Sequence, residues 1–155
     1  MSRGFWIAIA LLAAAALVAL EKIYGGGILT GSNAPQQGAT SGIDALMLAI
    51  AQAEGSPPAW NNPGDLTASF GFANSGPQNA DGVLAFSTIE GGWGALRAQL
   101  NLAAAGLSRV YNASMSILEM GMKYAGVSQG STWAANVAAA LGVDPSTPIG
   151  SFLNG

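Results

Sequence analysis

The chain has 155 residues, of which 50% are hydrophobic and only 8% are charged, and its formal net charge is −3. It contains no Cys and no His, which excludes the usual zinc hydrolases, Cys–His peptidases and Ser-His-Asp hydrolases. Its five Lys and Arg residues are scattered, so we expect no nucleic-acid binding. A hydrolytic enzyme of this composition must transfer protons with carboxylates, as in glycosidic-bond cleavage, and we expect no metal and no cofactor.

The first predicted element is a transmembrane helix. Residues 4–20 (GFWIAIALLAAAALVAL) are uncharged and almost wholly apolar, and such a run approaches the thickness of a bilayer core. The positive charge of Arg3 and of the amino terminus predicts a cytoplasmic N-terminus, with the remainder facing the periplasm or cell wall. A cleaved signal peptide is the alternative, although residues 17–21 lack a small-x-small cleavage site. We therefore expect a single-pass protein whose residues 1–24 anchor it in a lipid bilayer.

A linker and one domain are expected after the anchor. Residues 24–41 (YGGGILTGSNAPQQGATS) are rich in Gly, Ser, Asn and Pro and show no sustained periodicity. This composition predicts a flexible linker over residues 25–41. The remaining residues, 42–155, are enough for one compact domain.

The domain is predicted to begin with an amphipathic helix that ends near Glu54. Ile43, Met47 and Ile50 recur at helical spacing, and Ser41 with Asp44 gives a start similar to a capping box. The following residues, 55–87, contain several Pro and Gly residues and predict a loop region. Within it, a short hairpin is expected from residues 66–72 and 82–86.

Three further helices are predicted, so the expected fold class is mainly α. The second has Trp93, Leu96 and Leu100 on one face, which favours a core position for Trp93, and opens with a capping box from residue 87 to residue 90. The third follows Ser116, with Glu119 in the capping position. The fourth covers about residues 132–141 and contains Trp133 and Val137, and Trp133 has the same core interpretation as Trp93.

Most of the acidic residues have structural explanations. Glu90 and Glu119 lie three residues after a serine at a predicted helix start, where a carboxylate accepts from backbone N–H groups. Asp44 has the same explanation. Asp81 and Asp144 lie in segments typical of turns.

Glu54 differs from these residues because it falls on the buried face of its helix and at the helix's C-terminal end. Burial and the negative end of the helix dipole both disfavour a charged carboxylate, so its pKa should be raised. A general acid needs such an environment. The alternative is a solvent-facing Glu at a frayed helix end.

Three segments, AIAQAEG, WNNPGDL and FSTIEGGWGALRAQL, resemble the lysozyme-like superfamily over about residues 43–149. The resemblance is greatest to small muralytic domains of bacteriophage virions. It is more distant to goose-type lysozymes, lytic transglycosylases and autolysin-type glucosaminidases. It implies a lysozyme-like helical fold and maps the catalytic Glu, which ends a long helix in that superfamily, onto Glu54. The chain departs from many members at Gly55, where they have Ser.

The resemblance also suggests substrate contacts in the loop that follows Glu54. Asn61 and Asn62 resemble the Asn-Asn element of the glucosaminidases, and their amides, with Asp65, suit sugar hydroxyl and acetamido groups. The alternative for NNPGD is turn formation on local propensity alone. Tyr124 resembles the Tyr that orients the acid in transglycosylases, with a core aromatic as the alternative.

The sequence therefore predicts a membrane-anchored enzyme that cleaves the bond between N-acetylmuramic acid and N-acetylglucosamine in peptidoglycan glycan strands. A phage virion, with other virion proteins as partners and genome entry as the use, fits the resemblance. A non-catalytic structural or glycan-binding virion protein with the same fold is the alternative. Among reaction types a lytic transglycosylase is favoured, because Glu54 alone can serve it. A hydrolase using Asp65 as the second carboxylate is the other possibility.

Overall fold

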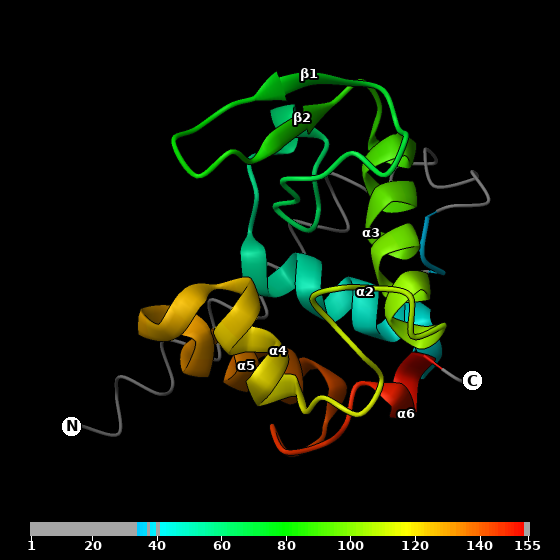
Figure 1. The fold of residues 1–155 in the computed structure, drawn as a ribbon, viewed down its shortest axis with the longest axis vertical. Helices are drawn as coiled ribbons and strands as arrows, with labels where there is room; N and C mark the ends of the chain where they lie inside the picture. The colour runs from blue at the N-terminus through cyan, green and yellow to red at the C-terminus, as the bar shows by residue number, and fades with distance from the viewer. Residues whose placement is uncertain (1–33, 37, 40, 154–155) are drawn as a thin grey trace.

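The computed structural model describes residues 34–36, 38–39 and 41–153 (Figure 1). The predicted membrane helix over residues 4–20 and most of the predicted linker therefore lie outside the described residues. Within the described part of the chain, no helix combines the length and apolar character needed to cross a bilayer. The described domain is mainly helical, as predicted, with one small two-stranded sheet.

Helix α2 (Gly42–Glu54) is the amphipathic helix predicted at the start of the domain, and it ends at Glu54, as the sequence indicated. Gly55 adopts a left-handed conformation with φ 61° and donates its backbone N–H to the Ala51 carbonyl, which closes the helix. The predicted capping by Ser41 and Asp44 is wrong, because the Ser41 side chain makes no cap hydrogen bond. The Asp44 carboxylate instead forms an ion pair with Arg97, at 2.5 Å.

The last residues of the predicted linker lie against the domain. The Arg97 guanidinium donates to the Ala34 carbonyl at 3.4 Å, and the Gln36 backbone N–H donates to Asp44 at 3.0 Å. Pro35 between them is buried. Contacts with the helical domain therefore begin before residue 42.

The loop region contains a short 3-10 helix η1 (Pro58–Trp60) and the antiparallel strands β1 (Asn74–Pro77) and β2 (Leu84–Phe86). The predicted second strand is confirmed, but the first was placed too early in the chain. Residues 66–72 instead form an irregular loop with one turn at Phe70 and Gly71, both of which have positive φ. This segment reaches β2 through the Leu84 backbone N–H, which donates to the Leu66 carbonyl.

Helix α3 (Ile89–Ala104) confirms the predicted second helix, but its capping residue is Thr88 and not the serine before it. The Thr88 side chain accepts a hydrogen bond from the Gly91 backbone N–H at 3.1 Å. The predicted capping box of residues 87 and 90 is therefore wrong, because the residue three positions after Thr88 is Gly91, which has no side chain to complete a box. Trp93 has no exposed surface, so its predicted place in the core is confirmed.

Helices α4 (Ile117–Tyr124), α5 (Gly126–Leu141) and α6 (Gly150–Leu153) complete the described domain. The capping box of Ser116 and Glu119 is confirmed by both of its hydrogen bonds. Helix α5 starts six residues before the predicted position. Its first six residues, GVSQGS, lack apolar periodicity, so the sequence pattern did not indicate that they are helical. Helix α6 was not predicted.

Helix α2 is central to the core and positions the residues at its end. Its side chains Leu46, Met47 and Ile50 have no exposed surface, and it packs against α3, α5 and α6. Figure 1 shows the end of α2 between the hairpin-bearing loop region and the α4–α5 pair. That pair is closely packed, since a Cβ added to Gly121 would lie 2.5 Å from the Gly130 carbonyl oxygen.

Candidate active site

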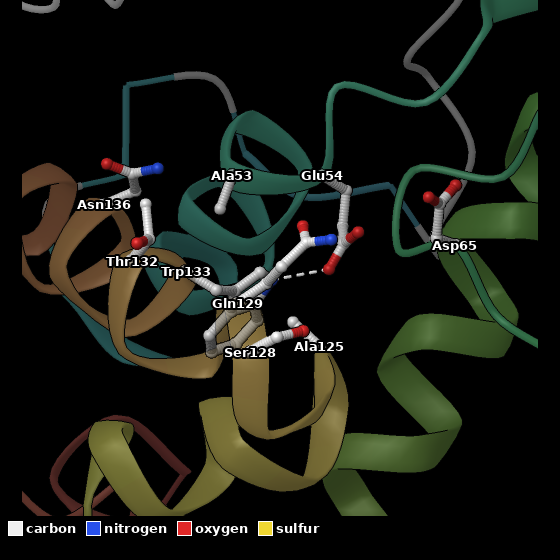
Figure 2. A pocket seen from close by; sticks show the side chains of 9 residues that line it. All are labelled: Ala53, Glu54, Asp65, Ala125, Ser128, Gln129, Thr132, Trp133 and Asn136. Atoms are coloured by element: carbon white, nitrogen blue, oxygen red, sulfur yellow. Dashed lines mark hydrogen bonds between the residues drawn. The ribbon is translucent and has the colours of Figure 1, made fainter.

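Glu54 lies at the last position of α2, with its side chain partly buried in a cavity (Figure 2). The apolar face of α2 holds the preceding turn in the core. The chain then turns away at Gly55, which leaves the carboxyl group facing open space on one side. The predicted position of Glu54 at the C-terminal end of its helix is therefore confirmed, and the side chain, predicted on the buried face, is partly buried.

Trp133 of α5 holds the carboxyl group in place. Its indole Nε1–H donates to Glu54 Oε1 at 2.5 Å, and the side chain is only 5% exposed. One carboxyl oxygen is thus occupied as an acceptor, which leaves Oε2 to carry a proton toward the cavity. The apolar spacing of α5 indicated a core role for Trp133, and nothing in its sequence neighbourhood indicated a partner 79 residues away.

Burial raises the pKa of Glu54 from its usual 4.5 to about 7. The hydrogen bond from Trp133 acts in the opposite direction because it favours the charged carboxylate, while the charge and side-chain hydrogen bonding of Asp65 raise the pKa further. The raised pKa agrees in direction with the expectation from burial. A substantial fraction of Glu54 is therefore protonated near neutral pH.

Asp65 lines the same cavity as Glu54, because the loop after α2 folds back. Its backbone is left-handed, with φ 46°, a conformation that Asp tolerates in turns. The Ser56 hydroxyl donates a short hydrogen bond to Asp65 Oδ1. Ser56 follows α2 directly, so it ties the carboxylate of the returning loop to the end of the helix that carries Glu54.

The cavity has a volume of about 350 Å³, near the lower end of the usual range for small-molecule sites. Glu54, Asp65 and Trp133 contribute to its wall. The remaining lining residues come from α2 and from the turn and helix of α5; they are Ala53, Ala125, Ser128, Gln129, Thr132 and Asn136. None of the polar residues of α5 was singled out from the sequence, since an exposed polar helix face is common in any domain.

Asn62 is fully buried and holds the loop together. Its amide Nδ2 donates to the Leu66 and Leu84 carbonyls, and its Oδ1 accepts from the Leu66 backbone N–H, all at 2.8–2.9 Å. These bonds join the Asp65 turn to β2. The turn interpretation of this Asn therefore accounts for its position, and its side chain does not line the cavity.

Asn61 also has a structural position. Its amide donates to the Phe86 carbonyl at 3.1 Å, and its backbone has φ 51°. Its carbonyl oxygen lies against the first turn of α3, where a Cβ on Gly92 would approach it to 1.8 Å. Of the loop residues expected to touch substrate, the structure brings only Asp65 to Glu54.

Tyr124 does not line the cavity but packs against Trp133, which does. The two rings stack with centroids 4.9 Å apart and an interplanar angle of 22°. The Tyr124 hydroxyl donates a short hydrogen bond to the Gly64 carbonyl, next to Asp65. Burial, followed by the nearby charge of Glu54, raises the pKa of this phenol well above its usual value, so it stays neutral. Tyr124 thus connects the wall that holds Glu54 to the loop that carries Asp65.

No group of three or more potential metal ligands of the Cys, His, Asp and Glu types occurs among the residues that the structure describes. The ionisable side chains among the described residues that line the cavity are Glu54 and Asp65, and their carboxyl groups have different surroundings. No protein-family model, curated protein or solved structure matches the chain.

Proposed function

We propose that this protein cleaves the glycosidic bond between N-acetylmuramic acid and N-acetylglucosamine in peptidoglycan, with Glu54 as the proton donor. The single observation that supports it best is a half-buried Glu with a pKa of about 7, at a helix end and lining a cavity. Glycosidic oxygens are poor leaving groups unless they are protonated, and a carboxylic acid of raised pKa supplies that proton. A helix-ending Glu in a mainly helical domain is also what the lysozyme-like resemblance implies.

The position of Asp65 supports hydrolysis as the reaction. Glu54 donates its proton to the glycosidic oxygen as the bond from C1 breaks, and the sugar leaves with a free hydroxyl. Asp65 accepts a proton from a water molecule, whose oxygen bonds to C1. This division of roles needs two carboxyl groups in unlike environments, and here one is largely desolvated while the other is held by a serine hydroxyl.

Lytic transglycosylation is the second candidate. The sequence favoured it because Asp65 and Asp81 both had turn explanations, and the place of Asp65 at the cavity weakens that argument. In this reaction Glu54 again protonates the leaving oxygen. Its carboxylate then accepts the proton of the muramic acid 6-hydroxyl, which bonds to C1 and gives a 1,6-anhydro end. Trp133 supports this candidate too, because it holds Glu54 in one orientation for both proton transfers.

The cellular setting is proposed from the sequence. The apolar residues 4–20 would hold the protein in a bilayer, with the domain facing the periplasm or cell wall. A virion component that opens the wall locally during genome entry would combine these features, with other virion proteins as neighbours.

Digestion of purified peptidoglycan by the full-length protein, followed by mass spectrometry of the released fragments, tests the proposal. Reducing ends from the wild type, with loss of activity in Asp65→Asn, support hydrolysis. Anhydro ends, which lack one water, support transglycosylation. A folded wild-type protein that binds glycan strands and releases no fragments contradicts cleavage and favours the non-catalytic glycan-binding alternative.

A further inference from the structure

One wall of the cavity is a row of polar side chains on α5. Ser128, Thr132 and Asn136 are spaced four residues apart and therefore lie along one face of the helix, with Gln129 beside them. We call these four residues the α5 ridge. The row extends over about 12 Å of helix, which is long enough for more than one sugar ring.

The side chains of the α5 ridge differ from those of the loop asparagines in their hydrogen bonding within the protein. All four of its side chains are exposed and make no hydrogen bond to any of the described residues. The amides of Asn61 and Asn62, in contrast, are bonded to backbone groups. Donors and acceptors at the ridge are therefore free to bind a ligand.

The chemistry of the cavity favours a neutral, hydroxylated ligand. Among the described residues that line it, the ionisable groups are Glu54 and Asp65, and no Lys or Arg is present to attract a phosphate or a peptide carboxylate. The ridge supplies two hydroxyls and two carboxamides, which can pair with sugar hydroxyls and with the N–H and C=O of an acetamido group. Ala53 and Ala125 also line the cavity and add no charged group.

Two residues of the ridge, Thr132 and Asn136, lie on a definite side of the proposed acid. In Figure 2, Thr132 and Asn136 lie on one side of Glu54 and Asp65 lies on the other. A glycan strand with its scissile bond at Glu54 would therefore place a neighbouring sugar against α5.

We infer that the α5 ridge is a binding subsite for an N-acetylated sugar next to the bond held at Glu54. This inference rests on the proposed function, since Glu54 defines where the bond lies. It assigns the main substrate contacts to α5, whereas the sequence predicted them at Asn61 and Asn62.

Binding is measured on the full-length chain carrying Glu54→Gln, which prevents cleavage, by calorimetric titration with a β-1,4-linked N-acetylglucosamine tetrasaccharide. Asn136→Ala and Thr132→Val should each weaken binding roughly three- to tenfold, because each removes one or two hydrogen bonds. The matching glucose tetrasaccharide, which lacks acetamido groups, should bind more weakly than the N-acetylated one.

Asn101→Ala on α3 and Ser131→Ala on α5 are the matched controls, because both residues are exposed helical positions outside the cavity. Unchanged affinity in Asn136→Ala and Thr132→Val, losses equal to those of the controls, or no binding of the tetrasaccharide at all would overturn the subsite. If Glu54→Gln does not fold, the same ridge variants in the wild-type background should raise KM for peptidoglycan fragments.

The two proposals fail separately. A wild-type chain that cleaves peptidoglycan while its ridge variants keep full affinity overturns the subsite alone. A chain whose ridge variants lose affinity, but whose wild type releases no fragments, retains the subsite and overturns the enzymatic proposal.

Discussion

Glu54 and Glu119 occupy opposite ends of their helices, and their surroundings differ accordingly. Glu119 is the third residue of α4 and is exposed; its carboxylate accepts from the Ser116 backbone N–H at 2.8 Å and from the Ser116 hydroxyl at 3.1 Å. These bonds favour the charged form and lower its pKa. Glu54 ends α2 and is largely withdrawn from water, which raises its pKa to about 7. The same side chain is thus a structural anion in one place and a potential acid in the other.

The largest expected difference between these two residues is in activity. Glu54→Gln should reduce the rate of fragment release from peptidoglycan by roughly 10²- to 10⁴-fold, because the amide cannot donate the proton. Glu119→Gln should leave the rate within about twofold, since a capping carboxylate takes no part in the chemistry. Equal losses in the two variants, with both folded by circular dichroism, would contradict the assignment of the acid.

The pH dependence of the wild-type rate should follow the protonated fraction of Glu54. The rate is expected to fall above about pH 7 and to approach a tenfold loss per pH unit, because the ionised carboxylate cannot act as an acid. Initial rates on a soluble glycan substrate between pH 5 and pH 9 measure this fall, which is the alkaline limb of the pH–rate profile. A limb near pH 4.5 would indicate an unperturbed carboxyl group.

Trp133→Phe should move the same limb by a smaller amount, toward higher pH. The indole N–H favours the charged form of Glu54, so its removal raises the pKa. Asp65→Asn should lower the pKa of Glu54, because Asp65 raises that pKa, and a carboxyl ¹³C NMR titration measures this change without requiring activity. Trp60→Phe is the matched control, because Trp60 of η1 does not line the cavity and its replacement should leave the pH dependence unchanged. A Trp133 role in packing alone would lower the rate without moving the limb.

The contrast between the two glutamates also marks what the sequence could predict. Glu119 and Ser116 are three residues apart, so a local pattern was enough to predict their bonds. The place of Glu54 at a buried helix end followed from apolar spacing in α2. Both predictions rest on interactions within a few turns of one helix.

The rest of the site depends on contacts that no local pattern encodes. Trp133 reaches Glu54 across 79 positions, and apolar spacing indicated only that its ring is buried. Asn62 occurs in a segment with equally good turn and ligand interpretations, and only its burial against β2 distinguishes them. The polar face of α5 has a role only because the fold places it beside Glu54.

The smallest expected effects are on stability, and they should have opposite signs in the two glutamate variants. The folded state raises the pKa of Glu54 above its usual 4.5, so ionisation of this group opposes folding as pH rises from 4.5 through about 7. Glu54→Gln removes that cost and should be more stable than the wild type at pH 8. Between pH 4.5 and pH 8, the free energy of unfolding of the variant should rise relative to that of the wild type by on the order of 2 kcal/mol.

The pKa of Glu119 is lowered on folding, so the contribution of its carboxylate to stability is present at neutral pH and is lost as pH falls through that lowered pKa. Glu119→Gln should therefore lower the thermal midpoint slightly at pH 7 and have no effect in strong acid. Calorimetric midpoints of both variants at pH 4.5 and pH 8, with a further point in strong acid for Glu119→Gln, measure the two signs. A Glu54→Gln protein that is destabilised at pH 8 would mean that the carboxylate is stabilised by its surroundings, and the case for Glu54 as an acid near neutral pH would fail with it.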